Sequence, residues 1–91
     1  MIEEIKIVEQ TPDIVAFDCE AVLYVNLKKG AIVSDHSHEH EETVFLMSGE
    51  AEIIIGVEKQ IIMAPAKIVI PPNIYHKFTA LTDLIGLELK S

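Results

Sequence analysis

Short apolar runs rich in Ile and Val, each stopped by turn residues, recur along the whole chain of 91 residues. Runs of this length that end at Gly, Pro, Asn or Asp are typical of β-strands, and no window shows convincing helical spacing. The predicted strands cover residues 5–8, 14–17, 21–27, 32–38, 43–47, 51–55, 57–63, 67–70, 76–81 and 84–89. Gly56-Val57 between two of these runs fits a two-residue type II′ hairpin turn. The pattern therefore predicts an all-β fold, most economically an antiparallel barrel.

The balance of charged residues excludes several classes of partner. Fifteen acidic residues stand against seven lysines, there is no arginine, and the formal net charge is −8. Nucleic acid and anionic membrane surfaces both require a basic face, so neither is an expected partner. No apolar stretch approaches the roughly 18 residues of a membrane span, and the first residues do not resemble a signal peptide. Cys19 is the only cysteine, so no internal disulfide can form, and we expect a cytoplasmic protein.

The apolar content suggests that part of the surface is covered by another subunit. Apolar residues make up 49% of the chain, more than a monomer of this size easily buries. The N-terminal run at residues 5–8 is the expected element to pair with or cover an edge strand of a second copy. We therefore predict a homodimer.

Three histidines and one glutamate carry the chemistry that the sequence predicts. His36 and His38 are two residues apart, so on one strand both side chains would leave the same face, about 6.6 Å apart. Glu42 follows across a turn and can supply a carboxylate oxygen from the next strand. His76 comes far later in the chain, after a Pro-Pro turn, and a closed barrel could bring it opposite the pair. These four residues are the predicted ligands of one metal ion.

The donor set limits the identity of the ion without fixing it. Three imidazole nitrogens and one carboxylate suit one divalent transition metal ion, namely Zn, Fe, Ni, Mn or Co. Four protein ligands on an ion that accepts six would leave two positions for water or for a substrate. The sequence therefore predicts a working metal site and not a sealed structural one.

The spacing of these residues resembles the first motif of the cupin superfamily. The segment Gly30-x5-His36-x-His38-x3-Glu42-x6-Gly49 fits that motif, G(X)5HXH(X)3–4E(X)6G, at every fixed position. The resemblance identifies the chain as a small single-domain cupin over residues 1–91, with the first motif at 30–49. It implies a double-stranded β-helix or jelly-roll barrel, ligands that point into the barrel, and a habit of dimerisation.

The second cupin motif, G(X)5PXG(X)2H(X)3N, is similar to residues 65–80 but differs at three positions. Pro71 and His76 match, whereas Pro65, Asn73 and Ala80 replace the two glycines and the asparagine. Asn73 is a mild change, because asparagine tolerates the left-handed backbone conformation that glycine supplies in a turn. The departures concern turn geometry and leave the expected metal ligand His76 in register.

The resemblance does not decide the activity. Cupins include dioxygenases, isomerases and non-enzymatic sensors, so two functions stay open. The chain is expected to be a metal-dependent enzyme, dioxygenase- or isomerase-like, acting on a small molecule in the barrel. Alternatively, it is a non-enzymatic module that binds or senses a small molecule or the metal itself. A wall of Val, Ile, Leu and Phe would favour a small and largely apolar ligand.

Several other polar residues lie near the predicted ligands in the sequence. His40 is expected at the solvated rim of the site, and the alternative is that it binds the metal or supports one of its ligands. Asp35, Glu39 and Glu41 are expected to be surface charges. Tyr24 and Tyr75 are the nearest further candidates for an acid or base, together with His40, and the sequence favours none of them.

Overall fold

Ten β-strands make up the secondary structure of the chain. The computed structural model describes residues 1–90, apart from the side chains of Ser34 and Asp35. The strands are β1 Lys6–Gln10, β2 Ile14–Cys19, β3 Val22–Leu27, β4 Ile32–His36, β5 Glu42–Ser48, β6 Glu50–Ile55, β7 Glu58–Met63, β8 Ala66–Ile70, β9 His76–Ala80 and β10 Leu84–Leu89. Every predicted strand is present with ends within two residues of the predicted ones. The described residues contain no helix long and apolar enough to cross a membrane.

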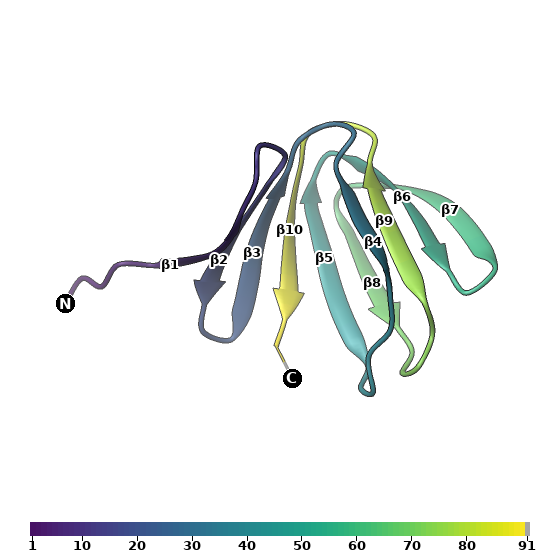
Figure 1. Ribbon diagram of the computed structural model, residues 1–91, viewed down its shortest axis with the longest axis horizontal. Helices are drawn as coiled ribbons and strands as arrows, with labels where there is room; N and C mark the ends of the chain where they lie inside the picture. Colours follow the sequence, from purple (N-terminus) through teal and green to yellow (C-terminus); the bar gives the residue numbers. More distant parts are fainter. Residues whose placement is uncertain (91) are drawn as a thin grey trace.

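The strands form two antiparallel sheets that face each other (Figure 1). One sheet has six strands in the order β1-β2-β3-β10-β5-β8, and the other has four in the order β4-β9-β6-β7. From β3 onward the chain changes sheet at every connection except the β6–β7 hairpin. This alternation is the double-stranded β-helix, or jelly roll, and the predicted fold class is confirmed.

Two tight turns follow directly from glycine positions. Residues 56 and 57 close the β6–β7 hairpin, in which Ile55 pairs with Glu58, and Gly56 has a φ of 60°. This arrangement agrees with the predicted type II′ turn. Gly49 alone connects β5 in one sheet to β6 in the other, with a φ of 91°. The corner between the two sheets therefore depends on a residue without a side chain.

The core lies between the facing sheets and is built from aliphatic side chains. Its larger cluster is formed by Leu27, Ala31, Leu46, Ala51, Ala80 and Leu84, and a second cluster by Ile53, Ile68 and Ile70. Within the strands, alternate residues supply these side chains, as the two-residue period of a strand requires. The same alternation along the strands directs polar side chains inward at one end of the barrel, where the candidate site is found.

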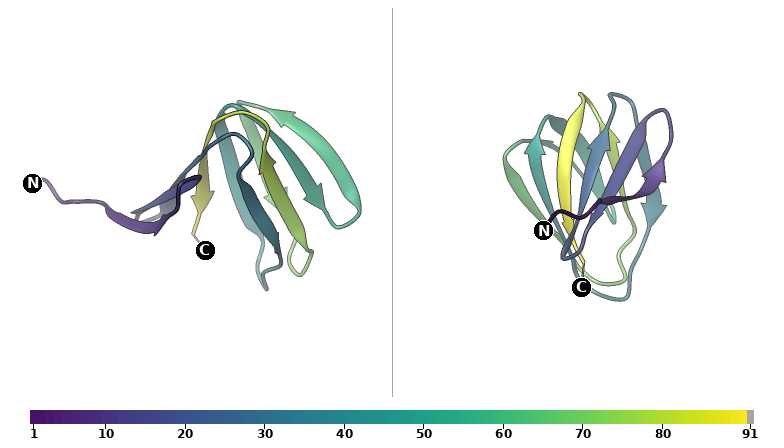
Figure 2. Two further views of the ribbon diagram at one scale, coloured as in Figure 1. Left: turned by 45° about the horizontal axis from the view of Figure 1, so that its top comes forward. Right: turned by 90° about the vertical axis from the view of Figure 1, so that its left-hand side faces the viewer.

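The N-terminal strand is the least buried part of the fold. All five residues of β1 are exposed, and β1 pairs only with β2 at the edge of the six-stranded sheet. β1 and the residues before it extend away from the two packed sheets (Figures 1 and 2). Ile7 and Val8 keep 51% and 54% of their surface exposed, so this edge presents apolar side chains together with unpaired backbone groups.

Candidate metal centre

Two of the predicted ligands are direct partners in the four-stranded sheet. His36 is the last residue of β4 and His76 the first of β9, and the two are register partners in the antiparallel pair. Their Nε2 atoms are 3.0 Å apart. His76 also pairs with Ile55 of β6 on its other side, and only 1% of its surface is exposed. The sheet thus places His76 directly beside His36. The sequence instead predicts His76 on the opposite side of the barrel, so that expectation is wrong.

The other two predicted ligands come from the connection between β4 and β5. β4 ends at His36, so His38 does not share a strand with it, and the expected projection of both rings from one strand is wrong. A register irregularity between Val33 and His36 accompanies this early end. His38 reaches the cluster from the loop, and its Nε2 lies 3.0 Å from Oε2 of Glu42 at the start of β5.

The turn before β9 holds that loop in place. Asn73 has a φ of 61°, the left-handed conformation expected from its place in the second motif. Its backbone N–H donates a hydrogen bond of 2.7 Å to the carbonyl oxygen of His38. This contact fixes the backbone of the loop that carries His38 close to the turn that leads into His76.

The four side chains offer ligand atoms at a spacing that suits a metal ion. One atom from each of His36, His38, Glu42 and His76 lies within 4.8 Å of all the others. The Nε2 of His76 is 3.0 Å from that of His36 and 3.4 Å from Oε2 of Glu42. Two ligands bonded at about 2.1 Å and at angles of about 90–110° would be separated by about 3.0–3.4 Å. The donor set and its spacing therefore fit one transition metal ion.

The hydrogen bonding of the four side chains also suits a bound metal ion. The Nδ1 of His76 lies 3.0 Å from the carbonyl oxygen of Ile74, which can only accept, so Nδ1 carries the proton and donates. Nε2 of His76 then presents a lone pair toward the cluster, as a metal ligand does. Oε2 of Glu42 is buried, and although Nε2 of His38 lies 3.0 Å away, no described residue donates it a hydrogen bond of good geometry. A cation between these facing lone pairs would satisfy both.

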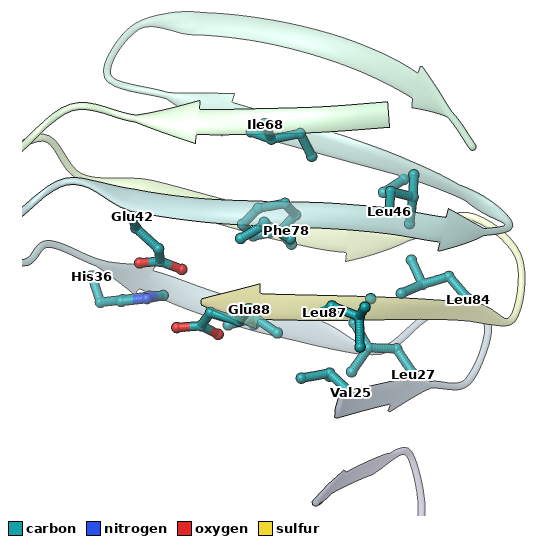
Figure 3. A pocket seen from close by; sticks show the side chains of 14 residues that line it. Val25, Leu27, His36, Glu42, Leu46, Ile68, Phe78, Leu84, Leu87 and Glu88 are labelled. Atoms are coloured by element: carbon teal, nitrogen blue, oxygen red, sulfur yellow. The ribbon is translucent and has the colours of Figure 1, made fainter. Parts of the chain in front are cut away.

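A cavity opens next to the cluster, between the two sheets. It measures about 80 Å³, and Figure 3 shows His36, Glu42 and Glu88 together at one of its ends. The rest of the wall is almost wholly apolar and comes from Val25, Leu27, Val33, Val44, Leu46, Ala51, Ile68, Phe78, Leu84, Gly86 and Leu87. The apolar wall of Val, Ile, Leu and Phe is therefore present, and Phe78 is its phenylalanine. A ligand in this cavity would reach the cluster with one polar end.

Glu88 is the functional candidate that sequence reasoning missed. It lies on β10, on the same strand face as buried Leu84 and Gly86. An acidic residue at the inward position of an otherwise apolar strand was the available signal. Burial and, next, the neighbouring charge of Glu42 raise the pKa of Glu88 from 4.5 to about 7, although His36 opposes the shift. The cluster therefore has a second carboxyl group beside it.

This raised pKa predicts how the stability of the metal-free protein depends on pH. The folded state keeps a proton on Glu88 that the unfolded chain releases above a pKa of 4.5, so stability falls as the pH rises from 4.5 to about 7. Because the side chain is only partly buried, we expect the loss to be about 1–2 kcal/mol. Urea unfolding in the presence of a chelator at pH 5 and pH 8 measures it. The Glu88→Gln variant should lose that part of the pH dependence. If the free energy of unfolding changed equally between pH 5 and pH 8 in both proteins, the pH dependence would not come from Glu88.

The remaining polar residues near the site lie outside the cluster. His40 is exposed and stacks on His38, with ring centres 5.7 Å apart, as expected for a rim residue. Glu39 and Glu41 are exposed surface charges, and the side chain of Asp35 lies outside the described residues. Tyr75 keeps 63% of its surface exposed and is not part of the cavity wall.

A jelly roll with a cluster of three histidines and one glutamate at one end of its barrel is the architecture of a cupin. The sequence matches the family model for the cupin domain over residues 23–88, which is most of the chain. The chain therefore belongs to the cupin family, and the predicted resemblance is confirmed. No curated protein matches it.

Solved structures support the same assignment. A conserved protein of unknown function from Streptococcus pyogenes is 26% identical, with a TM-score of 0.73 over 97% of this chain and 74% of that one. KdgF from Halomonas sp. is also 26% identical, with a TM-score of 0.69 over 93% of this chain and 74% of its own. An RmlC-like cupin from Shewanella frigidimarina shares the fold at 17% identity, with a TM-score of 0.79 over 93% and 81% of the two chains.

Proposed function

We propose that this cupin is a metal-dependent enzyme that acts on a small molecule held in the barrel, with dioxygenase- or isomerase-like chemistry. One observation carries the proposal: the His36, His38, Glu42 and His76 cluster lies at the end of an open, apolar cavity. A metal kept only for stability is normally enclosed by its protein ligands. A cluster that adjoins a cavity instead has room for a ligand beside the ion.

Each part of the site has a separate role in this proposal. His36, His38, His76 and Glu42 hold one divalent transition metal ion, which when bound supplies a Lewis acid or a centre for O₂ chemistry. The aliphatic wall and Phe78 exclude water and orient the body of the ligand. Glu88 places a carboxyl group at the polar end, where it can hold or receive a proton of the ligand.

The test compares turnover with simple binding. The protein is loaded separately with Fe(II), Mn, Co, Ni and Zn, and incubated with a library of small metabolites with and without O₂. Mass spectrometry and an oxygen electrode follow conversion. We expect at least one loaded form to convert a compound, and Glu42→Gln protein, which keeps the size of the side chain but removes its charge, to convert none.

The alternative function gives a different result in the same experiment. If compounds bind to the loaded protein and shift its melting temperature, but none is converted with any of the five metals, the chain is a binding or sensing module. That result would contradict the proposed enzyme.

We also propose that the protein is a homodimer. β1 exposes all five of its residues and is the free edge of the six-stranded sheet, so a second copy can cover Ile7 and Val8. Sedimentation at micromolar concentration should give about twice the chain mass of 10.1 kDa. Ile7→Lys together with Val8→Lys should shift the protein to monomers, whereas Val57→Lys, at the distant tip of the β6–β7 hairpin, should not. A wild-type protein that stays monomeric would refute this assignment.

A further inference from the structure

The cavity beside the candidate metal centre has a polar end and an apolar body. His36, Glu42 and Glu88 lie at the polar end, and Leu46, Leu84 and the other aliphatic wall residues enclose the remainder (Figure 3). A volume of about 80 Å³ holds roughly five to eight water-sized groups. A ligand that fills it is therefore small, mostly apolar, and polar at the end that meets the cluster.

The charges around the cavity decide what kind of polar group fits there. Among the described residues that line it, none is a lysine, and the chain has no arginine. Lys59 forms an ion pair with Glu52 at 3.4 Å and Lys90 one with Asp18, and neither lysine lines the cavity. A carboxylate or phosphate group on the ligand would find no cationic side chain in the wall and would face two carboxyl groups.

The acidic groups at the polar end also match the charge of the proposed ion. Glu42 and Glu88 together supply two negative charges when ionised, which balance one divalent cation. The polar end then has no net charge left for a charged ligand to neutralise. Glu88 is outside the group of four converging ligand atoms, and its carboxyl group is hydrogen-bonded to that of Glu42. A carboxyl group has two oxygens, so one of them can still face the ligand. A carboxyl oxygen accepts a hydrogen bond whether or not the group is ionised.

We propose that the ligand of this barrel is a small uncharged molecule with a hydroxyl group on an apolar body, and that Glu88 selects it by accepting a hydrogen bond from that hydroxyl. The inference rests on the proposed function, since it takes the metal site as the place where the hydroxyl oxygen arrives. Glu88 acts as a specificity-determining residue: it stabilises a bound hydroxyl group by accepting its hydrogen bond, and it disfavours an anion at the same position.

The test uses three probes with the same ring and different polar ends, namely benzyl alcohol, toluene and benzoate. Zinc affinity is first measured by competition with a chelator, and ligand-observed NMR titrations then give the dissociation constants on zinc-loaded protein. Benzyl alcohol should bind about 10-fold more tightly than either other probe, because the other two lack a donor or carry a charge. Glu88→Met keeps a long unbranched side chain without a strong acceptor, and should lose most of this preference.

Leu87→Met is the matched control, since it introduces the same side chain next to Glu88 in the same cavity wall. It should retain the preference for benzyl alcohol. A zinc-loaded wild-type protein that binds benzoate as tightly as benzyl alcohol, or a Glu88→Met variant with an unchanged preference, would overturn the inference. So would a zinc affinity about 100-fold weaker in Glu88→Met, because Glu88 would then be a metal ligand. A wild-type protein that binds no zinc would instead refute the proposed metal site.

Discussion

Replacing His76 with alanine is expected to weaken metal binding by about 100-fold or more. His76 is almost fully buried, its Nε2 lies within 3.4 Å of two other ligand atoms, and its Nδ1–H is held by the carbonyl of Ile74. A site of four protein ligands commonly binds with about 10–16 kcal/mol, so one ligand accounts for roughly 3 kcal/mol, which is about 100-fold. Competition with a chromogenic chelator measures the dissociation constant of each variant.

His40→Ala is the matched control for this experiment. His40 lies in the connection between β4 and β5, where it stacks on His38 but stays exposed and outside the converging ligand atoms. Its removal should change the affinity by less than about threefold, because no ligand is lost. A loss of affinity in His40→Ala with little change in His76→Ala would mean that the ion is held at the rim and not by His76.

The second large effect is expected at Gly49, where the chain passes from one sheet to the other. A Cβ atom added there would lie 2.4 Å from the backbone oxygen of Asp83 and 2.7 Å from Cβ of Leu84. The φ of 91° is also unfavourable for any residue with a side chain. Steric overlap and backbone strain together should make Gly49→Ala about 3 kcal/mol less stable, a fall in melting temperature of about 15 °C. Thermal and urea unfolding of the metal-free protein measure both.

Gly30 supplies the comparison, because it has nearly the same φ of 89° but nothing within 4 Å of an added Cβ. Gly30→Ala should therefore cost only the backbone strain, about 1 kcal/mol. The difference between the two variants isolates the steric part at Gly49. Equal losses of stability would show that the close approach to β10 does not constrain the corner.

Most of the fold could be predicted from the sequence because strands in a two-layer barrel carry a local signal. Inward and outward residues alternate, and glycine or proline marks most of the turns, so all ten strands could be located. The exception that matters is the end of β4. Alternation continues in the sequence as far as His38, but pairing with β9 ends at His36, and only the partner strand determines that.

The cluster of three histidines and one glutamate could be predicted from spacing, whereas the place of Glu88 beside it could not. His36, His38 and Glu42 lie within seven positions of each other, and His76 follows a recognisable turn. Glu88 is far from all of these residues along the chain. The sheet brings it near them, because Glu88 pairs with Val44 of β5, two residues after Glu42. In the sequence it reads as one acid among fifteen, and only the packing of β10 brings it to the cavity.

The most direct test of the metal centre is a crystal structure of the protein with anomalous diffraction recorded at the absorption edge of the metal it contains. We predict a single anomalous peak about 2.0–2.3 Å from Nε2 of His36, His38 and His76 and from Oε2 of Glu42, with its remaining positions open to the cavity. A peak at another place in the chain, or an ion enclosed by further protein ligands such as His40 or Glu39, would contradict the account.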